Sequence, residues 1–147
     1  GGNDLPIVPF VRNKNSGSQE LMESLVMTEP IPDGFYEEYY DDFKHVPQMY
    51  PLLTEVSYTE GGLGYTVFYY LTQIVRNGVF DDLTMIPMNG VAPDSKTIGN
   101  RSYPFTAEVY AIIRSDLDKS SMTYKIYELM QTEAGKRIIQ ESGYVPN

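Results

Sequence analysis

Four residues near the start of the chain, Arg12, Ser16, Gly17 and Ser18, have the types and spacing that can hold an oxyanion. Ser16 and Gln19 have the S-x-x-Q spacing of a capping box, which predicts that a helix begins at Ser16. The first N–H groups of a helix lack intrahelical partners, and the helix dipole concentrates positive charge there. Gly17 lets an anion approach the backbone, the serines add hydroxyl donors, and Arg12 adds a two-pronged guanidinium. The alternative is an ordinary capped helix with a surface arginine.

Two apolar segments must position these residues. Residues 5–11 form a β-like run, although Pro6 and Pro9 favour an edge or irregular strand. Residues 16–27 carry apolar side chains at helical spacing, which predicts an amphipathic helix. The oxyanion site would therefore lie between the end of a strand and the start of a helix.

The rest of the chain alternates strand-like with helix-like segments. An irregular stretch is predicted over 28–47, helices over 48–58, 70–77, 94–100, 119–131 and 133–142, and strands over 64–69, 83–88 and 105–113. Gly78 and Gly143 are expected to end the helices that precede them. Strands alternating with helices predict an α/β domain with a largely parallel or mixed sheet.

The composition is that of a folded chain with no affinity for nucleic acid. Its 147 residues, 41% of them hydrophobic, suffice for one domain with a real core. Eleven basic and twenty acidic side chains give a net charge of −9, whereas nucleic-acid binding depends on basic patches. A bound anion must therefore be held by short, directed hydrogen bonds. The absence of cysteine excludes disulfides, thiolate catalysis and cysteine-type zinc sites.

Neither a membrane span nor a leader is recognised in the sequence. No apolar stretch approaches the roughly 20 residues that a spanning helix needs. We interpret Gly1 and Gly2 as a cloning remnant or a cut end, so a natural leader is expected to have been removed.

An acidic, tyrosine-rich stretch is the second candidate for chemistry. Its carboxylates are those of Asp33, Glu37, Glu38, Asp41 and Asp42. Such a cluster suggests a calcium site or the carboxylate pair of a glycoside hydrolase. The D-x-D-x-D-G order of a calcium loop is missing, so we interpret the stretch as a solvated surface. A carboxylate-dependent hydrolase is a remote alternative.

Further motifs follow in order along the chain. The segment Gly61-Gly62-Leu63-Gly64-Tyr65 is, on local grounds, a tight turn before a buried strand. Later come Asn89-Gly90-Val91-Ala92-Pro93, Tyr103-Pro104-Phe105 and Gly143-Tyr144-Val145-Pro146. In this order and at these spacings, the set resembles the phosphate-specific substrate-binding proteins of bacterial ABC importers.

That family has an R-x-x-x-S-G-T/S segment, then G-x-(I/L)-G-Y, D-G-V-x-P, Y-P-hydrophobic and a terminal G-Y-V-P. The resemblance runs from about Ile7 to Pro146. Ser18 stands where threonine is common in the family, which keeps the hydroxyl donor. Asn89 replaces a frequent aspartate, at a position that we interpret as a turn.

The resemblance implies that inorganic phosphate is the ligand, with no cofactor, no metal and no catalysis. It implies a phosphate site formed by Arg12, Ser16, Gly17 and Ser18. It also implies a role as a cleft wall for Gly62, Gly64 and Tyr65, although the local pattern favours a structural role for the glycines.

The resemblance further implies a type II periplasmic-binding-protein-like fold with two α/β lobes around a cleft. The chain matches the second lobe and the segment that returns to the first. We therefore expect one domain over 3–147, with the second lobe at 3–104 and the returning segment at 105–147. Most of the first lobe has no counterpart here, including its acidic acceptor for the proton of hydrogen phosphate. The chain is accordingly interpreted as a fragment or a reduced variant.

Location and partners also follow from the resemblance. They are an extracytoplasmic setting, in the periplasm or on a surface lipoprotein, and an ABC permease that reads the full-length protein. The apolar faces of the last two helices would contact the missing lobe or favour self-association. Half a site predicts weak or undetectable phosphate binding. The first alternative is a sensory or interaction protein that reuses the lobe without transport.

Overall fold

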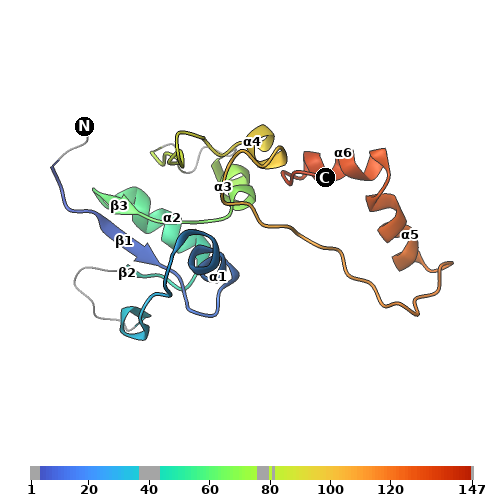
Figure 1. The fold of residues 1–147 in the computed structure, drawn as a ribbon, viewed down its shortest axis with the longest axis horizontal. Coiled ribbons are helices and arrows are strands. Elements are labelled where there is room, and N and C mark those ends of the chain that lie inside the picture. The colour runs from blue at the N-terminus through green and yellow to red at the C-terminus, as the bar shows by residue number, and fades with distance from the viewer. Residues whose placement is uncertain (1–3, 37–43, 76–79, 81, 147) are drawn as a thin grey trace. The chain divides into compact units, whose positions relative to one another are not determined.

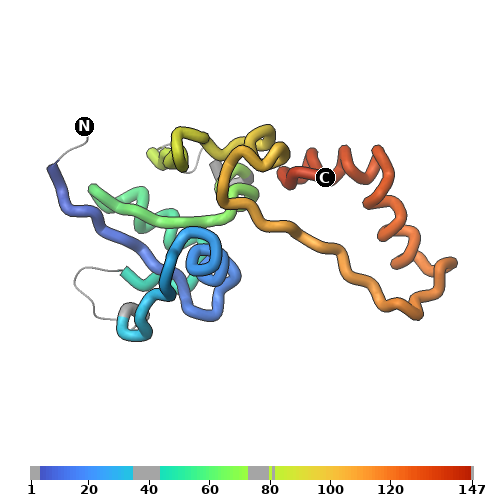
Figure 2. Tube along the Cα trace, viewed as in Figure 1, coloured from blue at the N-terminus to red at the C-terminus, as the bar shows by residue number. Residues whose placement is uncertain are grey.

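The computed structural model describes residues 4–36, 44–75, 80 and 82–146. Two compact units, 1–85 and 86–147, are described separately below (Figure 1; Figure 2 traces the same chain). The division into lobes at 3–104 and 105–147 stays a prediction. Among the described helices, none combines the length and the apolar character that a membrane crossing requires.

The first unit contains a three-stranded parallel sheet with the order β2-β1-β3. The strands are β1 (Val8–Val11), β2 (Lys44–His45) and β3 (Gly62–Leu63). β1 is thus the central strand, and the prediction of an edge or irregular strand over 5–11 is wrong. β2, which consists of two residues, was missed within the irregular stretch.

Pro9 is tolerated in the central strand because of where its missing N–H lies. Backbone polar groups of successive residues point to opposite sides of a strand. The carbonyl of Val11 accepts from the N–H of Val46 at 2.9 Å, so Pro9, two residues earlier, also faces β2. The described pairing with β2 begins only at Phe10. Pro9 therefore removes no donor from that pairing.

Three of the predicted helices are found in the first unit. They are α1 (Gly17–Leu21), which continues as the π-helical turn η1 (Met22–Val26), α2 (Met49–Tyr58) and α3 (Phe68–Val75); a 3-10 turn, η2, covers Asp33–Tyr36. α3 begins two residues before the predicted start, and its predicted stop, Gly78, lies outside the described residues. The predicted strand over 64–69 is wrong, because pairing occurs earlier, in β3, and Phe68 already begins α3.

The core of the first unit joins the sheet to α2 and α3. Its buried members are Phe10, Leu52, Leu53, Leu71 and Phe80. β1 supplies Phe10, and two consecutive leucines of α2 pack in the same cluster. This core fixes the carboxyl end of β1, from which Arg12 emerges.

The second unit is helical. It contains α4 (Ser95–Gly99), α5 (Met122–Met130) and α6 (Glu133–Glu141), each of which was predicted with slightly wider bounds. Ser121 and Thr132 cap α5 and α6 through their hydroxyls, as is usual for these residue types. Gly143 follows α6 with a φ of 100°, as expected of a glycine that ends a helix.

The strands predicted over 83–88 and 105–113 are not found among the described residues. Residues 83–88 contribute only Met88, which forms an isolated antiparallel bridge with Val91. The turn between them holds Asn89 at φ 52° and Gly90 at φ 80°, which confirms that Asn89 is a turn residue. The segment 105–113 is extended but unpaired, and its Ile112 is 91% exposed. Its β-branched and aromatic residues favour a strand, but a strand forms only where another supplies the ladder.

Candidate anion-binding site

Arg12 is a buried cation at the end of the central strand. It follows β1 directly and is only 7% exposed. Its Nε and Nη1 are buried and have no hydrogen-bond partner among the described residues. A guanidinium removed from water without a partner is unfavourable, and a carboxylate or phosphate is its natural complement. Arg12 therefore provides a charged, unfilled donor pair where ligands of α/β proteins commonly bind, beyond the carboxyl end of a parallel strand.

Ser16, Gly17 and Ser18 form the start of α1, as predicted. Ser16 is the N-cap, and its hydroxyl accepts from the N–H of Gln19 at 3.3 Å. The N–H groups of Gln19 and Glu20 both donate to the Ser16 carbonyl at 3.0 Å, so the helical bonding starts after Ser18. The N–H groups of the first turn are those that a helix leaves for a ligand.

The two serines differ in what they have left to offer. The Ser16 hydroxyl accepts the capping hydrogen bond from the Gln19 N–H and keeps only its own O–H as a donor. Ser18 is 8% exposed, and its Oγ is buried without a hydrogen-bond partner. Between them, a Cβ added to Gly17 would meet no atom within 4 Å. The start of α1 thus combines an unused hydroxyl with open space beside a glycine.

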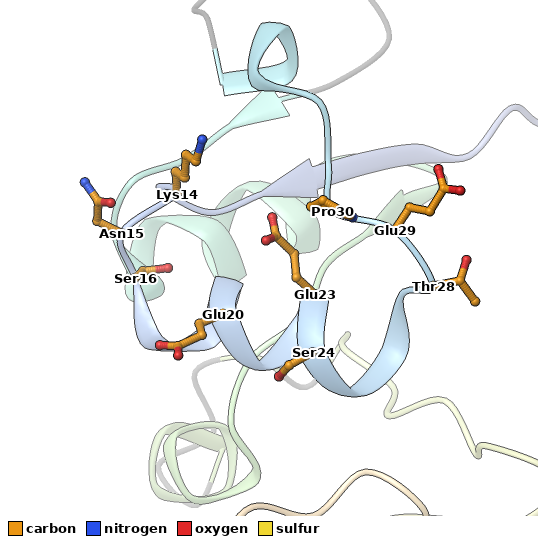
Figure 3. A pocket seen from close by; sticks show the side chains of 9 residues that line it. All are labelled: Lys14, Asn15, Ser16, Glu20, Glu23, Ser24, Thr28, Glu29 and Pro30. Carbon is orange, nitrogen blue, oxygen red and sulfur yellow. The ribbon is translucent and has the colours of Figure 1, made fainter.

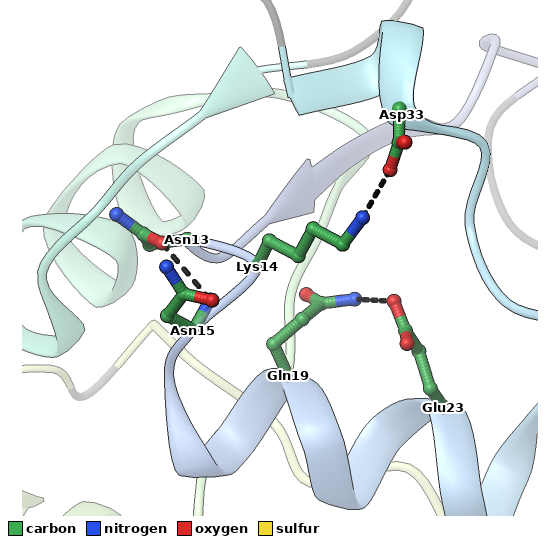
Figure 4. A network of polar contacts seen from close by, with 6 residues as sticks. All are labelled: Asn13, Lys14, Asn15, Gln19, Glu23 and Asp33. Carbon is green, nitrogen blue, oxygen red and sulfur yellow. Dashed lines mark hydrogen bonds and ion pairs between the residues drawn. The ribbon is translucent and has the colours of Figure 1, made fainter.

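The loop between Arg12 and α1 is closed by its own hydrogen bonds. The N–H of Ser16 donates to the carbonyl of Asn13 at 2.9 Å. The N–H of Asn15 donates to Oδ1 of Asn13 at 3.0 Å, and Lys14 forms an ion pair with Asp33 (Figure 4). Hydrogen bonding to that carboxylate raises the pKa of Lys14. The lysine thus faces a carboxylate, whereas the described residues give Arg12 no ion pair.

Only half of the predicted capping box forms. In a full box, the Gln19 side chain would return to the Ser16 N–H, but that N–H is taken by Asn13. The Gln19 Oε1 instead accepts from the N–H of Arg12 at 3.3 Å and from the Tyr65 hydroxyl. Gln19 is fully buried. Its S-x-x-Q spacing was read as a cap alone, so its contact with the arginine segment was missed.

Tyr65 reaches the same place from the glycine-rich segment. Its hydroxyl accepts from the N–H of Arg12 at 2.8 Å and donates to Gln19. Burial, which disfavours the phenolate, raises the pKa of Tyr65, against an opposing effect of the Arg12 hydrogen bond and charge. The segment that contains Arg12 and the glycine-rich segment, which are separate motifs in the sequence, therefore meet through the Tyr65 side chain and the Arg12 backbone.

The glycines before Tyr65 fit tightly into the first unit. A Cβ on Gly61, whose φ is 76°, would lie 2.6 Å from the carbonyl oxygen of Pro6. A Cβ on Gly64 would lie 2.8 Å from Cγ2 of Val56 and 2.9 Å from Cδ2 of Leu52. These approaches support the structural role favoured by the local pattern. A cleft-wall role for Gly62, Gly64 and Tyr65 stays a prediction.

A groove of about 600 Å³ lies between the loop before α1, the helix and the segment that follows it (Figure 3). It is lined by Lys14, Asn15, Ser16, Glu20, Glu23, Ser24, Thr28, Glu29 and Pro30. Three of these side chains are carboxylates, against one ammonium that Asp33 already engages. Such a lining repels an oxyanion. The groove is therefore a poorer candidate for the anion than the Arg12 side.

The acidic stretch can be assessed only at its first residue. Asp33 is exposed and pairs with Lys14. Glu37, Glu38, Asp41 and Asp42 lie outside the described residues. Within the part of the chain that the structure describes, no group of three or more potential ligand side chains could hold a metal ion.

Two known proteins are similar to this chain, one in sequence and one in structure. No protein-family model matches the chain. The chain is 24% identical, over 147 residues, to the phosphate-binding protein PstS of Bacillus subtilis (strain 168). Its structure is similar to that of PstS from Borrelia burgdorferi, with a TM-score of 0.62 and 21% identity. The resemblance detected in the sequence is confirmed.

The same comparisons establish the fold. The chain is an α/β, periplasmic-binding-protein-like unit with a parallel sheet flanked by helices, as predicted. In both comparisons, 99% of this chain is covered. It spans 43% of the length of the Bacillus PstS and 55% of the Borrelia PstS. The chain therefore corresponds to about half the length of these two PstS proteins.

Proposed function

We propose that this chain binds phosphate, or a closely similar tetrahedral oxyanion, through Arg12, Ser16, Gly17 and Ser18. The observation that carries the proposal is the buried Arg12 guanidinium, whose Nε and Nη1 lack partners in the described structure. Ser18 adds a second buried, unused donor. The name of the Bacillus protein supplies the ligand class, and the likeness of both proteins over the whole chain supports the transfer.

The biological role proposed is that of the solute-binding component of an ABC-type phosphate uptake system. The chain would act outside the cytoplasm, with an ABC permease as the partner of the full-length protein, and without catalysis. In such proteins, a ligand between two lobes closes them by a hinge motion. This chain corresponds to half of its relatives' length, so it is proposed to be a fragment that carries half of the site.

Half a site sets the expected affinity. A guanidinium, the two hydroxyl donors of Ser16 and Ser18 and two backbone N–H groups are few donors for an anion that water solvates well. We expect a dissociation constant of about 1 mM, equivalent to about −4 kcal/mol. Micromolar or tighter binding to the monomeric chain would contradict the half-site.

The test is an amide NMR titration of the 147-residue chain with sodium phosphate at constant ionic strength. Phosphate is expected to shift the Gly17 and Ser18 amide signals, whereas an equal ionic strength of chloride does not. Arg12→Gln should abolish these shifts. Arg114→Gln is the matched control, because Arg114 is exposed and already pairs with Asp116. Unchanged shifts in Arg12→Gln would refute the site.

A further inference from the structure

Tyr65, Gln19 and the backbone of Arg12 form a closed set of hydrogen bonds. The Arg12 N–H donates to the Tyr65 hydroxyl at 2.8 Å and to the Gln19 Oε1 at 3.3 Å, and the Tyr65 hydroxyl donates to the same Oε1. Each of the three groups thus contacts the other two. The set joins the ends of β1 and β3 to a side chain of α1.

The Nε2 group of Gln19 fixes the orientation of its side-chain amide, and so the direction of these hydrogen bonds. This Nε2 donates to Oε1 of Glu23 at 2.8 Å (Figure 4). A carboxylate accepts but does not donate, so it selects the amide orientation that turns Oε1 toward Arg12 and Tyr65. Gln19 is fully buried, which leaves no room for water to replace a lost partner.

The sheet register places Tyr65 beside Arg12. β3 runs parallel to β1, with Pro9 opposite Leu63. Two residues beyond this pair, the chain reaches Val11 at the end of β1 and Tyr65 just past the end of β3. The glycines that keep this part of the chain close to β1 and α2 thus bring the phenol to the start of the arginine loop.

We infer that Tyr65 is a positioning residue for the anion site, and that Gln19 relays its effect to α1. This inference rests on the phosphate-binding function proposed above. The phenol contacts the Arg12 main chain, so it holds the root of the guanidinium in register with the donors of Ser16–Ser18. Directed hydrogen bonds lose strength steeply when donors shift, so a small backbone displacement weakens the site without removing any of its donors.

The decisive variant is Tyr65→Phe, which keeps the ring and removes only the hydroxyl. We expect it to weaken phosphate binding about ten-fold in the NMR titration, the loss typical of one buried hydrogen bond left unpaired. The Arg12 amide proton should move upfield in this variant, because it loses its shorter hydrogen bond. Tyr58→Phe is the matched control, since Tyr58 is 86% exposed.

A second control separates positioning from loss of stability. Leu53→Ala removes a buried core side chain of α2 that takes no part in the hydrogen bonds between Tyr65, Gln19 and the Arg12 backbone. At a temperature where both variants are folded, Leu53→Ala should bind phosphate within about two-fold of the wild-type affinity. It should do so although it lowers the free energy of unfolding at least as much as Tyr65→Phe does. Equal weakening by the two variants would overturn the inference, because stability would then explain the effect.

The remaining outcomes distinguish this inference from the proposed function. If the wild type and Tyr65→Phe bind phosphate equally, and Arg12→Gln does not bind, positioning by Tyr65 is wrong and the phosphate site stands. If the wild type shows no phosphate-specific shift, the proposed function fails, and the inference fails with it.

Discussion

The backbone N–H of Arg12 donates to the phenolic oxygen of Tyr65 at 2.8 Å, although the two residues are 53 positions apart. This contact connects two segments that the sequence offers as separate motifs, one rich in potential anion donors and one rich in glycine. It shows why a parallel β-sheet is a suitable frame for such a site. Adjacent parallel strands end at the same edge, so the loops that follow them meet there.

Gly17→Ala should weaken phosphate binding without lowering the stability of the fold. A Cβ at position 17 meets no atom within 4 Å, and alanine at a compatible position stabilises by about 0.4–1 kcal/mol through the unfolded state. The same methyl group would occupy space through which an anion approaches the helix start, so phosphate binding should weaken at least about five-fold. Urea unfolding and the NMR titration measure the two effects. Wild-type affinity in this variant would mean that the anion does not approach Gly17.

Gly61→Ala should lower the stability of the fold, whereas Gly17→Ala should raise it. Its φ of 76° disfavours any side chain, and the new Cβ would lie 2.6 Å from the Pro6 carbonyl oxygen. We expect the free energy of unfolding to fall by about 1–3 kcal/mol. Gly17→Ala, in open space, is the control for the same substitution. A loss below about 0.5 kcal/mol would show that the turn before β3 can relax.

Leu52→Ala tests the core that supports the end of β1. Leu52 is fully buried in the cluster with Phe10, so its truncation should destabilise the first unit by about 2–5 kcal/mol. Tyr58→Ala, in the same helix but 86% exposed, should change stability by no more than about 0.5 kcal/mol. Urea unfolding of the two variants provides the comparison. Equal losses would contradict the placement of α2 against the sheet.

Alkaline pH should weaken the contribution of Tyr65 to stability. Its pKa is raised, chiefly by burial, above the ordinary value of 10.0. Below pH 10 the phenol is protonated in both folded and unfolded chains, and its contribution is fully present. As pH rises through the folded pKa, the unfolded chain has already released its proton, so stability is lost. The difference in urea midpoint between the wild type and Tyr65→Phe should therefore shrink from neutral pH to about pH 11. A difference that stays constant would contradict this placement of the phenol.

Local signals in the sequence were sufficient for the helices and the start of α1. Ser16, Asp94, Ser121 and Thr132 each cap a helix, because a hydroxyl or carboxylate one residue before a helical pattern acts within a few positions. The predicted strands were less reliable. Residues 105–113 have strand composition but no strand partner among the described residues, and Pro9 lies in the central strand on the side of β2, where the described pairing begins one residue later.

The role of Gln19 could not be inferred from its neighbours in sequence. Its spacing from Ser16 is that of a capping box, and only the fold reveals that Tyr65 and the Arg12 N–H compete for its side chain. Long-range competition of this kind leaves no periodic or local trace.

The closed loop between Asn13 and Ser16 has a consequence for how a ligand would be received. Its turn is held by the chain's own hydrogen bonds, from the Ser16 N–H to the Asn13 carbonyl and from the Asn15 N–H to the Asn13 side chain. Ordering a loose segment on association consumes part of the gross interaction energy. Here the chain has spent that conformational entropy during folding, so capture of an ion would require little reorganisation of this segment.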